Sequence, residues 1–126
     1  MFGVHALIIE DNQDSITVLG QLLRGEGATY SAVTRPSQLS METLDAASVI
    51  FLDLDMPEMN GYQVFKMLRG EYGIAAPIIA YTVNTNEKAT TRQLGFDGML
   101  AKPVDGACFH DQWERILAGE SIWDDC

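Results

Sequence analysis

Short, continuous apolar runs alternate along this chain with helix-like stretches, and this alternation is the feature that most limits its fold. Five runs have the length of a β-strand: residues 6–9, 29–33, 49–52, 78–81 and 99–101. The runs do not alternate apolar with polar residues, so we expect both faces of each strand to be buried. Strands of this kind, separated by helices, indicate a parallel sheet covered on both faces, which is an α/β, doubly wound fold.

The stretches between these runs carry apolar residues at helical spacing. Helices are predicted from residue 14 or 15 to about 25, and over residues 37–44, 62–69, 86–94 and 105–119. Asp14 or Ser15 is expected to cap the first helix. The tail beyond Gly119 is expected to fray, with Trp123 as the one side chain in it that could dock.

Length and charge restrict the classes of protein to which the chain can belong. Its 126 residues suit a single domain over residues 1–126, with a core at about 5–119 and a tail at 120–126. The formal net charge of -10 argues against nucleic acid or an anionic membrane as the main partner. Because no apolar run has the length of a bilayer span and the N-terminus lacks a secretory signal, we expect a cytoplasmic protein. Cys108 and Cys126 are too few for a disulfide framework, so both are expected to be reduced thiols.

Polar side chains follow four of the five predicted strands, at the edge of a parallel sheet where ligands bind. In chain order they are Glu10 and Asp11, then Asp53 and Asp55, then Thr82, and finally Lys102. Clustered carboxylates repel one another unless a cation neutralises them, and oxygen ligands without nearby His or Cys suit Mg²⁺ or Mn²⁺. A hydroxyl and an ammonium in the same pocket would donate to phosphoryl oxygens. This set of groups predicts phosphoryl transfer to or from a carboxylate.

Four short motifs give the chain a family resemblance. They are IIEDN at residues 8–12, FLDLDMPEMNG at 51–61, PIIAYT at 77–82 and AKPV at 101–104. In this order and at these spacings, the chain resembles the receiver domain of two-component response regulators from about His5 to Gly119. The resemblance implies a flavodoxin-like fold, with a five-stranded parallel sheet in the order 2-1-3-4-5, two helices on one face and three on the other.

The resemblance also implies an acidic metal site. It makes Asp53 the phosphoacceptor, a nucleophile that attacks the phosphorus of a phosphohistidine. Glu10 and Asp11 match the acidic pair that holds Mg²⁺, Asp11 directly and Glu10 through water. The backbone carbonyl of Asp55 matches the remaining protein ligand, beside Asp53 itself.

Two further residues match the family's phosphoryl-binding groups. Thr82 corresponds to the switch hydroxyl that moves inward with the phosphoryl group, and Lys102 to the ammonium that pairs with it. The Lys102-Pro103 bond matches one that is cis in the family, a geometry that proline tolerates at low cost.

The chain departs from the usual family pattern at three tuning positions. Met99 stands three residues before the lysine, where many receivers have a rotating Tyr or Phe, and Tyr81 is not assigned that role. Methionine can fill a gap in several rotamers, so the usual aromatic switching is put in doubt. Val83 replaces a smaller residue after Thr82, which predicts slower phosphorylation by small donors and slower hydrolysis. The side chain of Asp55 adds a charge near the opening.

A signalling role is the leading interpretation. The implied partners are a sensor histidine kinase or a phosphotransfer protein, and a downstream protein that binds the face of the fourth and fifth helices, with a homodimer as one assembly that the resemblance allows. No partnership with nucleic acid or membrane is expected, and the chain would not be an enzyme beyond assisting its own phosphorylation and dephosphorylation. A stand-alone receiver is expected rather than a fragment of a larger regulator.

Two other functions are weighed beside it. IFLDLDM also fits the strand and Asp-x-Asp of a haloacid-dehalogenase-type phosphatase, although the chain is short for that fold and lacks a late acidic pair. The third interpretation is a receiver-like interaction module whose output does not depend on phosphate. The intact acidic pair, Asp53, Thr82 and Lys102 argue against it, whereas Met99 leaves it open.

Overall fold

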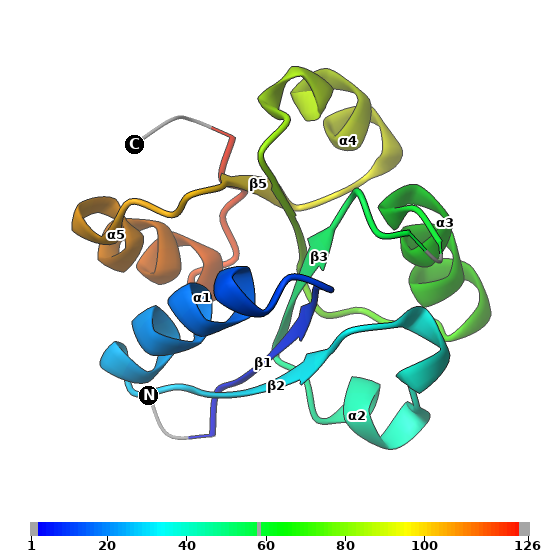
Figure 1. Ribbon diagram of the computed structural model, residues 1–126, viewed down its shortest axis with the longest axis horizontal. Coiled ribbons are helices and arrows are strands. Elements are labelled where there is room, and N and C mark those ends of the chain that lie inside the picture. Colours follow the sequence, from blue (N-terminus) through cyan, green and yellow to red (C-terminus); the bar gives the residue numbers. More distant parts are fainter. Residues whose placement is uncertain (1–2, 58, 124–126) are drawn as a thin grey trace.

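Within the residues that the structure describes, the chain folds into five strands and five α-helices that alternate along the sequence (Figure 1). The computed structural model describes residues 3–57 and 59–123. The elements are β1 (His5–Ile9), α1 (Gln13–Gly25), β2 (Thr29–Val33), α2 (Met41–Asp45), β3 (Val49–Asp53), α3 (Gly61–Lys66), β4 (Ile78–Thr82), α4 (Lys88–Leu94), β5 (Gly98–Ala101) and α5 (Gly106–Leu117). The predicted strands therefore exist, and each matches its apolar run to within one residue at either end.

The strands form one parallel sheet in the order β2-β1-β3-β4-β5, which confirms the flavodoxin-like topology. In the register of the sheet, Ile9 pairs with Leu52 and Asp53 pairs with Tyr81. All five carboxyl ends therefore lie at one edge of the sheet, and the strand order reverses between β1 and β3. This edge is where the polar residues after the strands meet.

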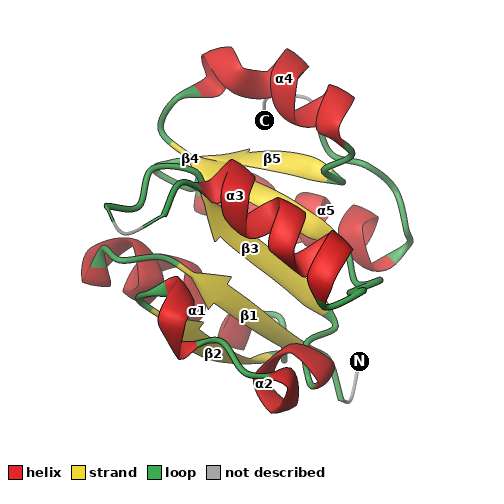
Figure 2. Cartoon of the chain, turned by 90° about the vertical axis from the view of Figure 1, so that its right-hand side faces the viewer, coloured by secondary structure: helices red, strands yellow, loops and turns green. Residues whose placement is uncertain are grey.

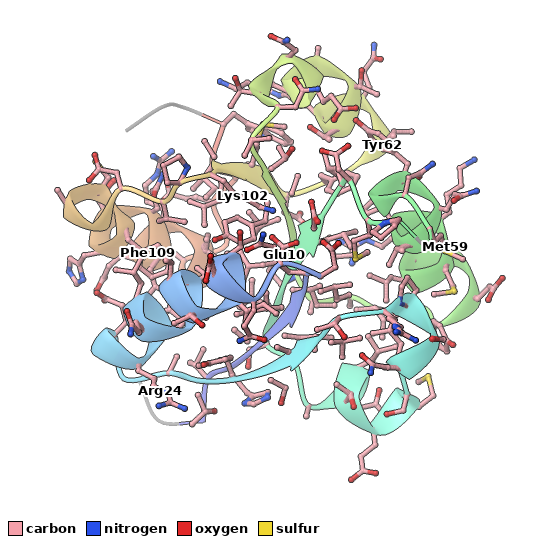
Figure 3. All side chains as sticks on the ribbon, in the orientation of Figure 1. Glu10, Arg24, Met59, Tyr62, Lys102 and Phe109 are labelled. Carbon is pink, nitrogen blue, oxygen red and sulfur yellow. The ribbon has the colours of Figure 1, made fainter. Side chains whose placement is uncertain are left out.

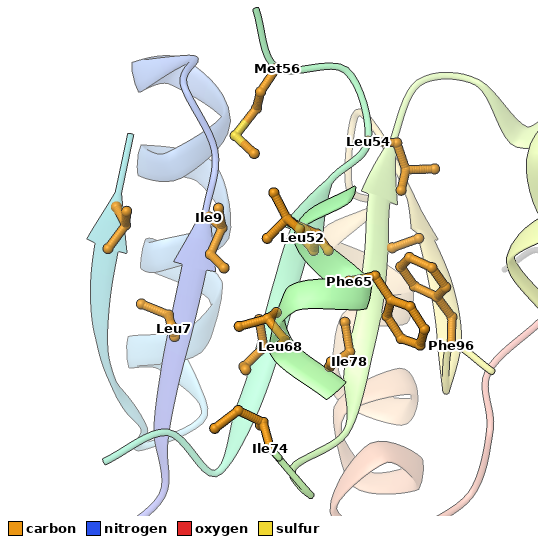
Figure 4. Packing of buried hydrophobic residues seen from close by; sticks show 14 of the residues in the cluster. Leu7, Ile9, Leu52, Leu54, Met56, Phe65, Leu68, Ile74, Ile78 and Phe96 are labelled. Atoms are coloured by element: carbon orange, nitrogen blue, oxygen red, sulfur yellow. The ribbon is translucent and has the colours of Figure 1, made fainter. Parts of the chain in front are cut away.

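Apolar side chains cover both faces of the sheet. On one face, α1 and α5 pack their apolar sides, with Leu19 and Phe109 fully buried. On the other face lie α2, α3 and α4, as the turned view shows (Figure 2). Here Phe65 of α3 stacks on Phe96, the residue that comes after the turn at the end of α4, with ring centroids 4.1 Å apart (Figure 4). Burial on both faces explains why the strand sequences are apolar throughout.

The helix predicted over residues 37–44 is wrong as a single element. Residues Pro36–Gln38 form a 3₁₀ turn, Leu39 and Ser40 are extended, and α2 begins only at Met41. Ser40 causes the break, because its side chain accepts the backbone N–H of Thr43 and so caps a new helix.

The first helix begins earlier than expected, for a similar reason. Asn12 caps α1 by accepting the N–H of Ser15 at 2.9 Å, so the cap is neither Asp14 nor Ser15. The early cap makes the connection from the buried end of β1 to α1 short.

The fraying predicted for the C-terminal tail is wrong for Ile122 and Trp123. Ile122 forms a parallel bridge with Gly98, and its carbonyl accepts the N–H of Met99 at 2.8 Å. This is the red segment that runs beside β5 in Figure 1. Trp123 is only 9% exposed and joins the apolar layer that contains Met99, so the prediction that this side chain could dock is confirmed. Residues 124–126 lie outside the described part of the chain.

Two observations concern the cysteines and the length of the helices. The expected reduced thiol is wrong for Cys108, which is disulfide-bonded in the structure, while Cys126 lies outside the described residues. Within residues 3–57 and 59–123, no helix combines the length and apolar character needed to cross a bilayer.

Candidate functional site

The carboxyl ends of β1, β3 and β5 bring an acidic cluster and one lysine together. Glu10 and Asp11 come directly after β1, Asp53 ends β3, and Lys102 comes directly after β5. Figure 3 places the labelled side chains of Glu10 and Lys102 near each other at the centre of this edge. The sequence predicted this convergence, because parallel strands end at the same edge.

Glu10 is the most deeply buried member of the cluster, with no exposed surface. One carboxylate oxygen, Oε2, accepts the backbone N–H of Asp11 at 3.0 Å and that of Asn12 at 3.5 Å. The other, Oε1, accepts from the ammonium of Lys102. A buried carboxylate requires such partners, and Glu10 therefore has donors on both oxygens.

Asp53 is also buried, and only 4% of its surface is exposed. Its Oδ1 accepts the N–H of Asp55 at 3.1 Å and lies 3.5 Å from Nζ of Lys102. The lysine thus lies between two carboxylates, paired closely with Glu10 and more loosely with Asp53.

Glu10 and Asp53 differ in their affinity for a proton. Burial and the interaction with Asp53 raise the pKa of Glu10 to about 7, against the opposing effect of Lys102. Burial also acts to raise the pKa of Asp53, but hydrogen bonds with Glu10 and with the Asp55 N–H, together with the charge of Lys102, outweigh it and lower that pKa. The pKa of Glu10 therefore lies above that of Asp53, so Asp53 is the first of the two acids to ionise as the pH rises. Asp53 is left ionised, the form that a nucleophile needs.

The cluster has the chemistry of a magnesium site. One carboxylate oxygen from each of Glu10, Asp11 and Asp53 lies within 4.8 Å of the other two. These hard ligands, with one exposed member and two buried ones, suit a small divalent cation that retains water in its shell. The raised pKa of Glu10 also fits a metal site, because burial and the neighbouring Asp53 make the negative charge of Glu10 unfavourable. A bound cation would offset that unfavourable charge.

Thr82 is placed beside the cluster but faces a different carboxylate. Its buried hydroxyl accepts the N–H of Asn84 at 3.0 Å and donates to Oδ2 of Asp55 at 3.5 Å. The side chain of Asp55 is therefore engaged with Thr82 in this structure.

The other two tuning positions lie in contrasting surroundings. Val83 is 70% exposed, directly after Thr82. Met99 is 5% exposed and belongs to the apolar layer beneath α3 and α4. The Lys102-Pro103 peptide bond is cis, as the family resemblance implies.

One aromatic residue beside the site is not identified by the sequence patterns. Nζ of Lys102 lies over the ring of Tyr81, 4.8 Å from its centroid. The only sequence signal is the position of Tyr81 at a strand end, one residue before Thr82. Its contact with Lys102 depends on the path of the lysine side chain, which the sequence does not give.

Comparisons with known proteins bear on the family and the fold of the chain. A model of the response regulator receiver domain family matches residues 6–113. Sensory transduction protein RegX3 of Mycobacterium tuberculosis is 35% identical over 100 residues, covering 77% of this chain and 43% of RegX3. Probable histidine kinase 2 of Oryza sativa subsp. indica is 28% identical over 123 residues, covering 82% of this chain and 12% of the kinase. The chain thus spans less than half the length of these relatives.

Solved structures share the fold and, in one case, hold a metal. The receiver domain of sensor histidine kinase PA1611 from Pseudomonas aeruginosa, with a magnesium ion coordinated in its active site cleft, matches with a TM-score of 0.77 at 28% identity. The match covers 92% of this chain and 98% of that one. Chemotaxis protein CheY4 of Vibrio cholerae matches with a TM-score of 0.75 at 21% identity, covering 90% and 98% of the two chains, and this likeness concerns the fold alone. The family match, the sheet order and the acidic edge favour a signalling domain over a phosphatase, and the chain belongs to the response regulator receiver domain family.

Proposed function

We propose that this receiver domain accepts a phosphoryl group on Asp53 from the phosphohistidine of a sensor histidine kinase or a phosphotransfer protein. The observation that carries the proposal is the placement of Asp53. Its carboxylate has a lowered pKa, lies 3.5 Å from the Lys102 ammonium and belongs to the acidic cluster. A carboxylate without a neighbouring cation would repel an anionic phosphoryl group. The positive charge beside Asp53 reduces this repulsion, so its ionised oxygen can attack the phosphorus.

The transfer forms one bond and breaks another. An oxygen of Asp53 bonds to phosphorus while the P–N bond of the phosphohistidine breaks, and its electron pair returns to the imidazole nitrogen of a ring whose other nitrogen carries a proton. The product is an acyl phosphate on Asp53 and a neutral histidine on the donor. Lys102, now paired mainly with Glu10, is placed to donate to the new phosphoryl oxygens as well.

The acidic cluster supports binding of Mg²⁺, or of Mn²⁺ with similar chemistry. Asp11 and Asp53 would hold the ion directly, Glu10 through water, and the backbone carbonyl of Asp55 would complete the protein ligands. When bound, the ion would neutralise part of the negative charge of the phosphoryl group.

Thr82, Asp55 and Val83 would control the response of the domain after transfer. Thr82 donates to Asp55 at 3.5 Å, so binding a phosphoryl oxygen requires it to exchange one acceptor for the other. This exchange is the local event that would start switching, as the resemblance implies for the hydroxyl. Val83, being exposed beside the site, would narrow access for small donors and for water.

The proposed output surface is the face formed by α4, β5 and α5, where a downstream protein or a second copy would bind. Ile122 and Trp123 cover part of this face, and Arg92 of α4 lies over the Trp123 ring, 5.6 Å from its centroid. Met99, which stands in place of the usual aromatic residue, belongs to the same apolar layer as Trp123. When Thr82 moves, the packing of Met99 in this layer would change, and this change would alter the face. A phosphate-independent interaction module would lack that response.

The remaining parts of the proposal concern the whole chain. We propose that residues 1–126 form one receiver domain whose only catalysis is on itself. A cytoplasmic location, without nucleic acid or membrane as a direct partner, would fit its charge of -10. The disulfide of Cys108 counts against a cytoplasmic location, because disulfides are rare in the reducing cytosol. Alkylation of free thiols in freshly lysed cells would show whether it forms there.

The function is tested with phosphoramidate, a small donor with a P–N bond, in the presence of Mg²⁺. Wild type should gain one phosphoryl group, measured by intact mass, and Asp53→Asn should gain none. Asp111→Asn, an exposed aspartate on α5, is the matched control and should behave as wild type. Equal phosphorylation of Asp53→Asn and wild type would overturn the assignment.

A further inference from the structure

Tyr81 has an unusual set of contacts for a residue of a buried strand. It lies in β4, one residue before Thr82, with 1% of its surface exposed. Its hydroxyl donates to the backbone carbonyl of Ser15 in α1 at 3.0 Å. This bond fixes the direction of the long axis of the ring, because one end is held by the strand and the other by the helix, and the apolar layer around the buried ring restricts its rotation about that axis.

The face of this ring meets the ammonium of Lys102. Nζ lies 4.8 Å from the ring centroid, within the range of a cation–π interaction. The same ammonium contacts Glu10 and lies 3.5 Å from Oδ1 of Asp53. It is therefore held from three sides, by two carboxylates and by one aromatic face.

The backbone next to Lys102 is also tied to β4. Its N–H donates to the carbonyl of Thr82 at 2.9 Å, so the start of the lysine side chain is fixed beside Tyr81. Successive side chains of a strand point to opposite faces, which sends Thr82 toward Asp55 and Tyr81 toward α1. Burial, together with the smaller effects of the charges of Glu10 and Asp53, raises the pKa of Tyr81, so the ring that meets the ammonium is that of neutral tyrosine.

We propose that Tyr81 is a positioning residue for phosphotransfer, whose ring holds the Lys102 ammonium where it reaches both Asp53 and an incoming phosphoryl group. This inference rests on the proposed function, since Tyr81 would act on the same site by positioning Lys102. Lysine has a long, flexible stem, and Glu10 alone would hold it by a single charge. The ring restricts the ammonium to the position that the transition state needs, which is a form of preorganisation.

A purely structural role for Tyr81 makes a different prediction. Tyr81 belongs to the apolar layer beneath α1 and α5, so removing the ring will also loosen that layer. The two roles are separated by changes that keep the shape of the ring but alter its charge distribution. A fluorinated ring fills the same space and loses the negative face that attracts a cation.

The experiment compares four proteins with wild type in single-turnover phosphorylation by phosphoramidate and Mg²⁺. Tyr81→Phe should keep the wild-type rate within about twofold, since the ring remains. Pentafluorophenylalanine at position 81 and Tyr81→Leu should each slow phosphorylation by about tenfold. Tyr30→Leu is the matched control, because Arg24 lies over Tyr30 at 5.3 Å in a cation–π pair outside the site, and its rate should be unchanged.

A second readout does not depend on phosphorylation. The ε-methylene protons of Lys102, assigned through Lys102→Arg, should be shifted upfield by the ring in wild type and Tyr81→Phe, and shifted less in Tyr81→Leu. If wild type shows this shift but gains a phosphoryl group neither from phosphoramidate nor from a phosphohistidine donor, the proposed function fails while the contact stands. A fluorinated variant with the wild-type rate, or a Phe variant as slow as Leu, would overturn the positioning role. If Tyr81→Leu does not fold, the fluorinated ring still decides.

Discussion

The ammonium of Lys102 is ion-paired with the fully buried carboxylate of Glu10, although the two residues are 92 positions apart in the sequence. The pair joins the end of β1 to the end of β5 across the site. In this arrangement Glu10 has two tasks. Its carboxylate anchors the lysine, and its interaction with Asp53 helps to lower the pKa of that second acid. Glu10 therefore influences both Lys102 and the proposed nucleophile, Asp53.

Replacing Glu10 with Gln tests its part in metal binding. Gln keeps an acceptor for the N–H groups of Asp11 and Asn12 but removes one charge from the cluster. Mg²⁺ affinity at pH 8, measured by titration calorimetry, should fall about tenfold. Glu26→Gln removes the same charge away from the cluster and should leave the affinity unchanged. An equal loss in both variants would mean that only the net charge of the protein matters.

His110 provides a pH-dependent contact between α5 and the end of α1. Nδ1 lies 2.6 Å from Oε1 of Glu26, and this hydrogen bond is the main reason why the pKa of His110 is raised. Because the pKa of His110 is higher in the folded than in the unfolded protein, the contact stabilises the fold fully at pH values below the unfolded pKa of about 6.5. This stabilisation is lost as the pH rises through the pKa that His110 has in the folded protein. In an NMR titration Glu26→Gln should lower the pKa of His110. An unchanged midpoint would contradict the assigned cause.

Gly61 lets α3 begin directly against the end of β3. A Cβ at this position would lie 2.6 Å from the Asp53 carbonyl oxygen and 2.6 Å from Cα of Leu54, both of which are backbone atoms. Gly61→Ala should therefore reduce the free energy of unfolding in urea by about 2 kcal/mol, as over-packing does elsewhere. Gly25→Ala, where nothing lies within 4 Å of the added Cβ, should be neutral or slightly stabilising. Equal stability of the two variants would refute the steric argument.

The docking of the tail depends on the absence of a side chain at Gly98. A Cβ there would lie 2.6 Å from Cγ1 of Ile122 and 2.7 Å from its carbonyl oxygen. Gly98→Ala should displace the tail and speed hydrogen exchange of the Met99 amide, which donates to that carbonyl at 2.8 Å. Gly106→Ala, with only an ordinary contact at 3.6 Å to Leu22, should leave the amide protected. Full protection in Gly98→Ala would show that the bridge tolerates the change.

The sequence predicted the features that arise from local patterns and parallel topology. Apolar runs gave the strands, and residues just after them gave Glu10, Asp53 and Lys102 at one edge. The pairing within that edge could not be predicted, because it depends on side-chain paths over long sequence separations. Lys102 contacts Glu10 more closely than Asp53, and Thr82 faces Asp55.

The tail was predicted less well, for a physical reason. Ile122 and Trp123 are too few to show a period, and their burial arises from Gly98 and the apolar layer around Met99. The break before α2 has a local cause that the sequence did contain, since Ser40 precedes Thr43 at the spacing of a cap. The predicted start at residue 37 falls instead in the 3₁₀ turn that follows Arg35.

The most direct test of the central claim locates the phosphoryl group itself. Wild type is phosphorylated with phosphoramidate and Mg²⁺, reduced with borohydride, which converts an aspartyl phosphate to homoserine, and mapped by peptide mass spectrometry. We predict homoserine at position 53, with Asp11 and Asp55 unmodified. Homoserine at either of those two positions, or a borohydride-resistant phosphate on Thr82, would contradict the assignment of Asp53 as the phosphoacceptor.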